Sequence, residues 1–133
     1  MCDNARMSYE TYKLIHFLGL ILLFMSLGGA ALHVMNGGIK ATNGSRKFLA
    51  ITHGVALGLV FLGGMGLMKW KGISHGGPYP IWLYPKVAVW LLLGGITALI
   101  WRKPTLGNLY WLLIPVLGGI AVFFATVKPF NVP

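Results

Sequence analysis

The feature that most constrains this chain is a long apolar run from Tyr12 to Met35, YKLIHFLGLILLFMSLGGAALHVM. No charged residue lies between Lys13 and Lys40. A helix rises about 1.5 Å per residue, so about 20 apolar residues cross a hydrocarbon core about 30 Å thick. The run is therefore long enough to span a membrane as a helix.

Three further runs of the chain resemble the first, so we predict four spans, at about residues 12–35, 47–70, 82–101 and 108–127. Only 10% of the 133 residues are charged, against about a quarter in a typical soluble domain. Four spans and short loops account for the whole length. We therefore predict an all-α fold: one transmembrane domain, residues 1–133, folded as an antiparallel up-down four-helix bundle in a lipid bilayer.

Two local signals set the expected ends of the first helix. Residues 1–8 are polar, and Ser8 is a residue type that caps helix N-termini, so we expect the helix to begin near it. The motif Asn36-Gly37-Gly38 is expected to end the helix, because glycine readily adopts the left-handed conformation of a helix C-cap.

The chain carries a formal net charge of +9. Its basic residues mostly flank the apolar runs, as interfacial anchors do, and this placement argues against a nucleic-acid partner. Each side of the membrane receives five of them, so the positive-inside rule does not fix the orientation. One side has Arg6, Lys13, Lys69, Lys71 and Lys128, and the other has Lys40, Arg46, Lys47, Arg102 and Lys103.

Acidic residues are absent after Glu10. Proton-coupled carriers usually keep a carboxylate within the membrane, so this absence argues against that class and against carboxylate catalysis inside the bundle. The chemistry-bearing residues that remain near the spans are His16, His33, His53 and Lys86.

Histidines His33 and His53 are expected to face each other. Each lies ten residues from Asn43, the middle of the first loop, and residues equidistant from a hairpin turn lie at similar depth. On a helical wheel, His33 shares a face of small and polar residues with His16, and His53 shares one with glycines and alanine. Two histidines on neighbouring helices can hold haem iron, so this pair is one predicted metal and cofactor site.

A second candidate site combines His16, early in the first span, with Lys86, early in the third, and His75 in the loop before it. A lysine buried in lipid is costly and therefore a functional candidate. The alternative is that these residues only reach towards the membrane surface. The glycines of the second span, including the pair Gly54 and Gly58, equally suit close packing of helices.

The residues around His16 and Lys86 resemble a known group. The run Lys13-Leu14-Ile15-His16-Phe17-Leu18-Gly19 resembles the first span of small bacterial membrane proteins that include the HemJ-type protoporphyrinogen oxidases, the CopD-like copper-resistance domain and the SirB-like proteins. The segment Trp82-Leu83-x-x-Lys86-Val87 is similar to their Trp-Leu-x-x-Lys-Leu pattern. The similarity covers about residues 12–101.

This resemblance implies a four-helix membrane protein that binds haem b, with His16 and Lys86 at the positions of the first-span histidine and third-span lysine of the HemJ type. It places His53 at the second-span histidine of the SirB-like proteins. The HemJ-type Leu-Pro-Arg segment is replaced here by Gly29-Ala30-Ala31-Leu32-His33. Porphyrinogen oxidase activity is therefore not implied.

These observations predict a protein of the bacterial cytoplasmic (inner) membrane that binds haem b or a related porphyrin in a redox or porphyrin-handling role. Neutral imidazoles would ligate the iron, and Lys86 would pair with a propionate. Two alternatives remain: an accessory subunit without a cofactor, whose glycine-rich faces pack on partner subunits or a second copy, and a small metal or solute permease. No catalytic residue is identified, and the question of enzymatic activity stays open.

Overall fold

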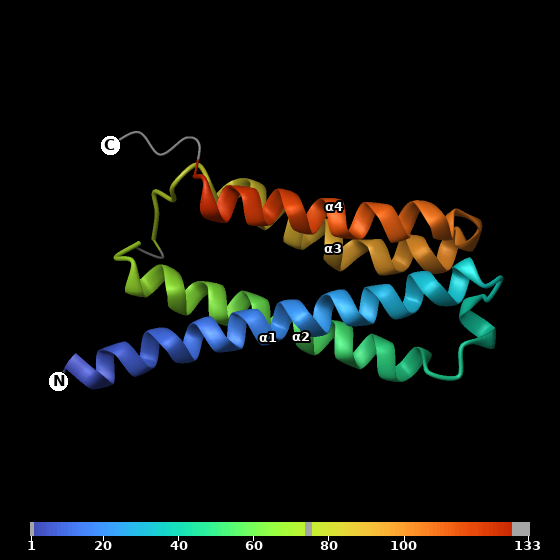
Figure 1. Cartoon of the computed structure of the whole chain (residues 1–133), viewed down its shortest axis with the longest axis horizontal. Coiled ribbons are helices and arrows are strands. Elements are labelled where there is room, and N and C mark those ends of the chain that lie inside the picture. Colours follow the sequence, from blue (N-terminus) through green and yellow to red (C-terminus); the bar gives the residue numbers. More distant parts are fainter. Residues whose placement is uncertain (1, 74–75, 129–133) are drawn as a thin grey trace.

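The computed structural model describes residues 2–73 and 76–128, and all regular elements in these ranges are helical (Figure 1). Four of its helical segments are long and apolar enough to cross a membrane. This confirms the predicted all-α fold with four spans, and the chain is a multi-pass membrane protein. The elements are α1 (Cys2–Met35), the 3₁₀ helix η1 (Lys40–Thr42), α2 (Arg46–Trp70), α3 (Leu83–Arg102), the 3₁₀ helix η2 (Pro104–Leu106) and α4 (Gly107–Thr126).

Of the two predicted ends of α1, one is wrong and one is confirmed. The helix begins at Cys2, not near Ser8. No glycine or proline interrupts residues 2–12, so nothing breaks the helix before the membrane span. At the other end Gly37 has a φ of +81°, and the N–H of Gly38 donates to the carbonyl of His33 at 3.0 Å. This is the expected glycine cap.

The four helices run up and down, so each end of the bundle has its own connections (Figure 1). We call the end with η1 and η2 the loop end, and the end where α1 begins and α4 finishes the terminal end. Helix α1 packs most extensively against α2, and less against α4 and α3. Contacts between α2 and α3 are few. The bundle is therefore centred on α1.

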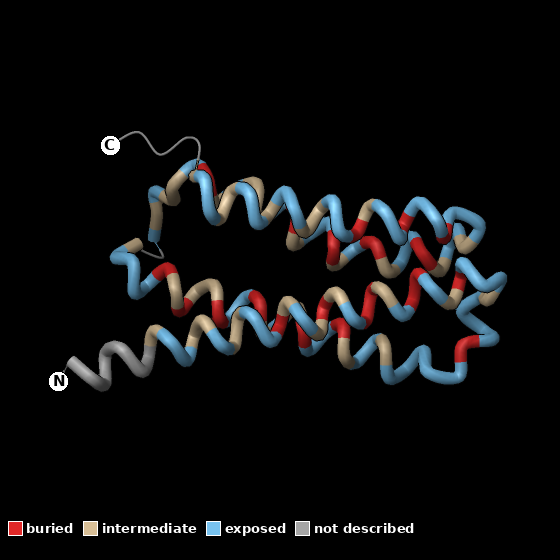
Figure 2. Tube along the Cα trace, viewed as in Figure 1, coloured by how far each residue is buried: buried red, intermediate tan, exposed pale blue. Residues whose placement is uncertain are grey.

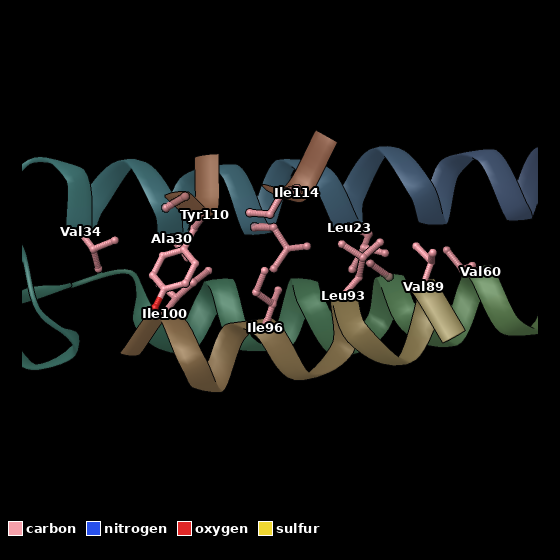
Figure 3. Packing of buried hydrophobic residues seen from close by; sticks show 13 residues of the cluster. Leu23, Ala30, Val34, Val60, Val89, Leu93, Ile96, Ile100, Tyr110 and Ile114 are labelled. Carbon is pink, nitrogen blue, oxygen red and sulfur yellow. The ribbon is translucent and has the colours of Figure 1, made fainter. Parts of the chain in front are cut away.

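The apolar core is richest towards the loop end, where buried positions face one another across the helices (Figures 2 and 3). Tyr110 of α4 is completely buried there, next to Ile100 of α3. The Tyr110 hydroxyl donates to the carbonyls of Leu99, at 3.1 Å, and Lys103, at 2.8 Å. Both carbonyls also accept a backbone N–H, Leu99 from Lys103 at 2.8 Å and Lys103 from Leu106 at 3.2 Å. The shared Tyr110 hydroxyl proton therefore adds a second donor and links α4 to the end of α3 in the core.

Two glycines of α2 allow its close approach to α1. A Cβ at Gly63 would lie 2.6 Å from the Cβ and backbone N of His16, and one at Gly66 would overlap the ring of Tyr12. The predicted packing pair Gly54 and Gly58 behaves differently, since both are exposed and have open space around them. Their prediction as packing residues within this chain is therefore wrong. The helices cross nearer the terminal end.

The buried face of α1 is broader than predicted. Ser26 and Ala30 are buried on the face of small residues, as expected. Leu23 and Leu27, which do not belong to that face of small residues, are also buried. Helix α1 contacts all three other helices, so its apolar side chains as well as its small ones face protein.

Candidate functional site

His16 lies one to two turns inside the membrane span of α1, against the glycines of α2. Its Nδ1 lies 2.8 Å from the carbonyl oxygen of Val60. A carbonyl only accepts hydrogen bonds, so Nδ1 carries the proton and the neutral ring has its lone pair on Nε2. Among the described residues, Nε2 has no hydrogen-bond partner. An imidazole held by Nδ1 with Nε2 available is the usual arrangement of a metal-ligating histidine.

Lys86 lies on the first turns of α3, at the same end of the bundle as His16. Its Nζ is 5.6 Å from the ring centroid of Trp82. The two residues of the second predicted site therefore lie at the same end of the bundle, and a single site formed by both stays a prediction.

Two further lysines surround the same indole ring. Lys128, after α4, has its Nζ 5.0 Å from the Trp82 centroid, and Lys71, after α2, has its Nζ at 5.7 Å. Partial burial, and then the positive charges of Lys128 and Lys86, lower the pKa of Lys71 from its ordinary value. We call Lys71, Lys86 and Lys128 the lysine group.

The side chain of His53, on α2, is buried, with an exposed fraction of 8%. Its Nε2 lies 3.1 Å from the Thr97 hydroxyl and 3.3 Å from the carbonyl oxygen of Gly94, both on α3. Its Nδ1 is buried and without a hydrogen-bond partner in the described part of the chain. His53 therefore links α2 to α3 within the membrane, where these two helices have few other contacts.

His33, at the end of α1, has different neighbours. Its Nε2 lies 2.9 Å from the carbonyl oxygen of Ile39 and 3.4 Å from the Thr42 hydroxyl, and its ring lies edge-on to Trp101. These contacts tie the helix end to the loop that contains η1. The Nε2 atoms of His33 and His53 are thus engaged with separate partners, and iron binding by this pair stays a prediction.

The described residues contain no group of three or more His, Cys, Asp or Glu side chains suited to a metal ion. A further candidate, His75, lies outside the described residues. Two apolar grooves occur on the bundle, one of about 250 Å³ beside Phe24, Trp111 and Pro115, and one of about 350 Å³ between α3 and α4. Neither groove is lined by a histidine or lysine.

No known protein family, curated protein or solved structure matches this chain. The assignment of a function therefore depends on the geometry of its own residues.

Sequence reasoning placed His16 and Lys86 together but missed Lys71, Lys128 and Trp82. Each lysine alone has the signature of an interfacial anchor after a span, and Trp82 that of an interfacial aromatic. The proximity of these three residues could have been predicted from the topology of the bundle. In an up-down bundle the end of α2, the start of α3 and the end of α4 meet at one end of the molecule (Figure 1).

Proposed function

We propose that this membrane protein binds haem b, or a related porphyrin, at the terminal end of the bundle, where the imidazole of His16 would ligate the iron. The observation that carries the proposal is the hydrogen bond from His16 Nδ1 to the Val60 carbonyl, at 2.8 Å. It fixes the ring orientation and leaves Nε2 as the donor atom for iron.

The positive charge at the terminal end of the bundle also favours a porphyrin ligand. A porphyrin with propionate groups is a planar apolar anion, and Lys86 supplies a positive charge at the same end of the bundle as His16. No acidic side chain follows Glu10 in the sequence, so α2, α3 and α4 offer Lys86 no competing carboxylate. The donor set therefore fits one axial imidazole and a lysine for a propionate. Bound haem would supply one-electron chemistry at this end of the membrane.

His16 is a better candidate for the iron ligand than the pair of His33 and His53, because hydrogen bonds already engage the Nε2 atoms of that pair. Both of these histidines use Nε2 to hold elements together, His33 in the first loop and His53 between α2 and α3. Ligation through Nε2 would break those contacts, and an unpaired polar group in a membrane costs several kcal/mol. His16 would bind through an atom that no described residue engages, whereas the unengaged Nδ1 of His53 is fully buried within the protein.

This function belongs to a multi-pass protein of the bacterial cytoplasmic membrane, in redox chemistry or porphyrin handling. A cofactor-free accessory subunit is the second candidate. It is favoured by the roles of His33 and His53 as links between elements, which require no cofactor. The two candidates differ in whether the purified protein binds a chromophore.

The test is an absorption spectrum of the detergent-purified protein, before and after dithionite, and again after addition of hemin. Haem binding predicts a Soret band that shifts on reduction. His16→Ala is expected to abolish the band, and Lys86→Gln to weaken hemin binding. His33→Ala is the matched control, because it removes an imidazole from the same helix and is expected to retain the band.

Two results would overturn the proposal. A band that survives His16→Ala but disappears in both His33→Ala and His53→Ala would move the site to the loop end. A featureless spectrum from folded wild-type protein, unchanged by hemin, would exclude haem binding and favour the cofactor-free accessory subunit.

A further inference from the structure

The lysine group gathers positive charge from three parts of the chain around one buried ring. Trp82 is only 6% exposed, and the three Nζ atoms lie 5.0 to 5.7 Å from its ring centroid. Lys71 follows α2, Lys86 lies on the first turns of α3, and Lys128 follows α4. Folding of the whole bundle is therefore needed to bring the three together.

The chain offers this group almost no negative charge. Asp3 and Glu10 are its only acidic side chains, and both lie in α1. Glu10 is exposed, and the charges that act on Lys71 are those of Lys128 and Lys86. The indole face attracts cations through its quadrupole, but it carries no net charge and cannot neutralise three of them. The group is therefore electrostatically incomplete.

Local geometry shows that the lysines are held together against their repulsion. The Nζ atoms of Lys71 and Lys128 lie 5.7 Å and 5.0 Å from the same indole centroid, although each ammonium group offers the other only donors. Lys128 also has a φ of +47°, a left-handed conformation that a residue with a Cβ adopts at a cost. Two solvated surface anchors would separate. An anion bound between them would remove the repulsion.

We propose that Lys71, Lys86 and Lys128 bind the phosphate group of an anionic phospholipid from the leaflet at the terminal end. A phosphate offers several acceptor oxygens, enough to receive donors from all three ammonium groups. Trp82 is the residue immediately before α3, so it stands at the end of a span, the position at which interfacial tryptophans occur. Basic pockets between the ends of membrane helices bind lipid phosphates in this way.

The inference is independent of the haem proposal, although Lys86 enters both. Free phosphate shares the chemistry of the headgroup, so the experiment must separate these two sources. It must also leave Lys86 unchanged, so that the His16 site is not altered by the substitutions.

The test is native mass spectrometry of the full chain in non-ionic detergent, titrated with dioleoylphosphatidylglycerol and, separately, with dioleoylphosphatidylcholine. The variant is Lys71→Gln with Lys128→Gln. The matched control is Lys13→Gln with Lys69→Gln, which removes two positive charges from the same end of the bundle but outside the group. Each lysine at such a site contributes a factor of about five, so we expect the variant to bind phosphatidylglycerol at least about tenfold more weakly.

The control variant is expected to bind phosphatidylglycerol as the wild type does, and phosphatidylcholine is expected to bind weakly to all three proteins. Competition by millimolar inorganic phosphate would support a site for the phosphate group itself, whereas its absence would support recognition within the lipid. Equal phosphatidylglycerol binding by the wild type and the Lys71/Lys128 variant would overturn the proposal. This readout requires no chromophore, so the lipid proposal can be tested even if the protein does not bind haem.

Discussion

Replacement of Gly63 by alanine tests the close contact between α1 and α2 beside His16. The new Cβ would lie 2.6 Å from the Cβ and backbone N of His16 and 2.7 Å from its Cα. None of these atoms is the end of a flexible side chain. The two helices must therefore separate by roughly 1 Å before the contact becomes an ordinary van der Waals distance.

The cost of this separation has two parts. Overpacking of a tight contact costs about 1–3 kcal/mol. The same movement stretches the hydrogen bond from His16 to Val60, now 2.8 Å, beyond useful length, and its loss costs about 0.5–1.5 kcal/mol. Alanine is also the better helix former, by about 1 kcal/mol. Gly64→Ala is the matched control for this gain in helix propensity. A Cβ at Gly64 would lie 3.6 Å from the His16 ring, which is an ordinary contact.

We therefore expect Gly63→Ala to be less stable than Gly64→Ala by about 2–4 kcal/mol. The free energy of unfolding would be measured by steric trapping in bicelles, with wild type and both variants compared under the same conditions. Values for the two variants within about 0.5 kcal/mol would refute the reasoning, since they would show that α1 does not contact α2 at Gly63.

Three further outcomes follow from single contacts. Thr97→Val removes the hydroxyl that meets His53 at 3.1 Å, and should lower the free energy of unfolding by about 0.5–1.5 kcal/mol in the same assay. Tyr110→Phe keeps the buried ring but removes the hydroxyl that donates to the Leu99 and Lys103 carbonyls; both carbonyls keep a backbone donor, so the change should cost only about 0.5–1.5 kcal/mol. Binding of phosphatidylglycerol should weaken as pH rises, beginning below the ordinary range of lysine, because the pKa of Lys71 is lowered by partial burial and by Lys128 and Lys86. In titrations from pH 7 upward, Lys71→Gln should reduce this early loss.

The number of spans and their positions could be predicted from the sequence, because both depend on length and hydropathy within single segments. The predicted spans at 12–35 and 82–101 agree closely with Tyr9–Met35 and Leu83–Arg102. The buried side of α2 at His53 and Ala56 also followed from helical periodicity alone. These are properties of one helix at a time, which a wheel represents well.

The contact between two helices could not be predicted in this way. Gly58 and Gly63 look equally suitable in the sequence, yet only Gly63 meets another helix. The choice depends on where α1 and α2 cross, and that point is set by packing along the whole length of both helices. Matched depth likewise suggested that His33 and His53 face each other, whereas nearer acceptors in the loop and on α3 engage their Nε2 atoms.

The two ends of the bundle differ in what holds them together, and this difference bears on function. At the loop end, Ile100 and Tyr110 are fully buried, and the Tyr110 hydroxyl bonds to the backbone that ends α3. At the terminal end, three lysines share one indole and a histidine keeps a ring nitrogen that no described residue engages. Natural proteins depart from local rules of stability mainly where function requires it. The unengaged Nδ1 of His53 is fully buried, whereas the unneutralised charge and the unengaged nitrogen of His16 both occur at the terminal end, so ligands are expected there and the loop end is expected to hold the helices in place.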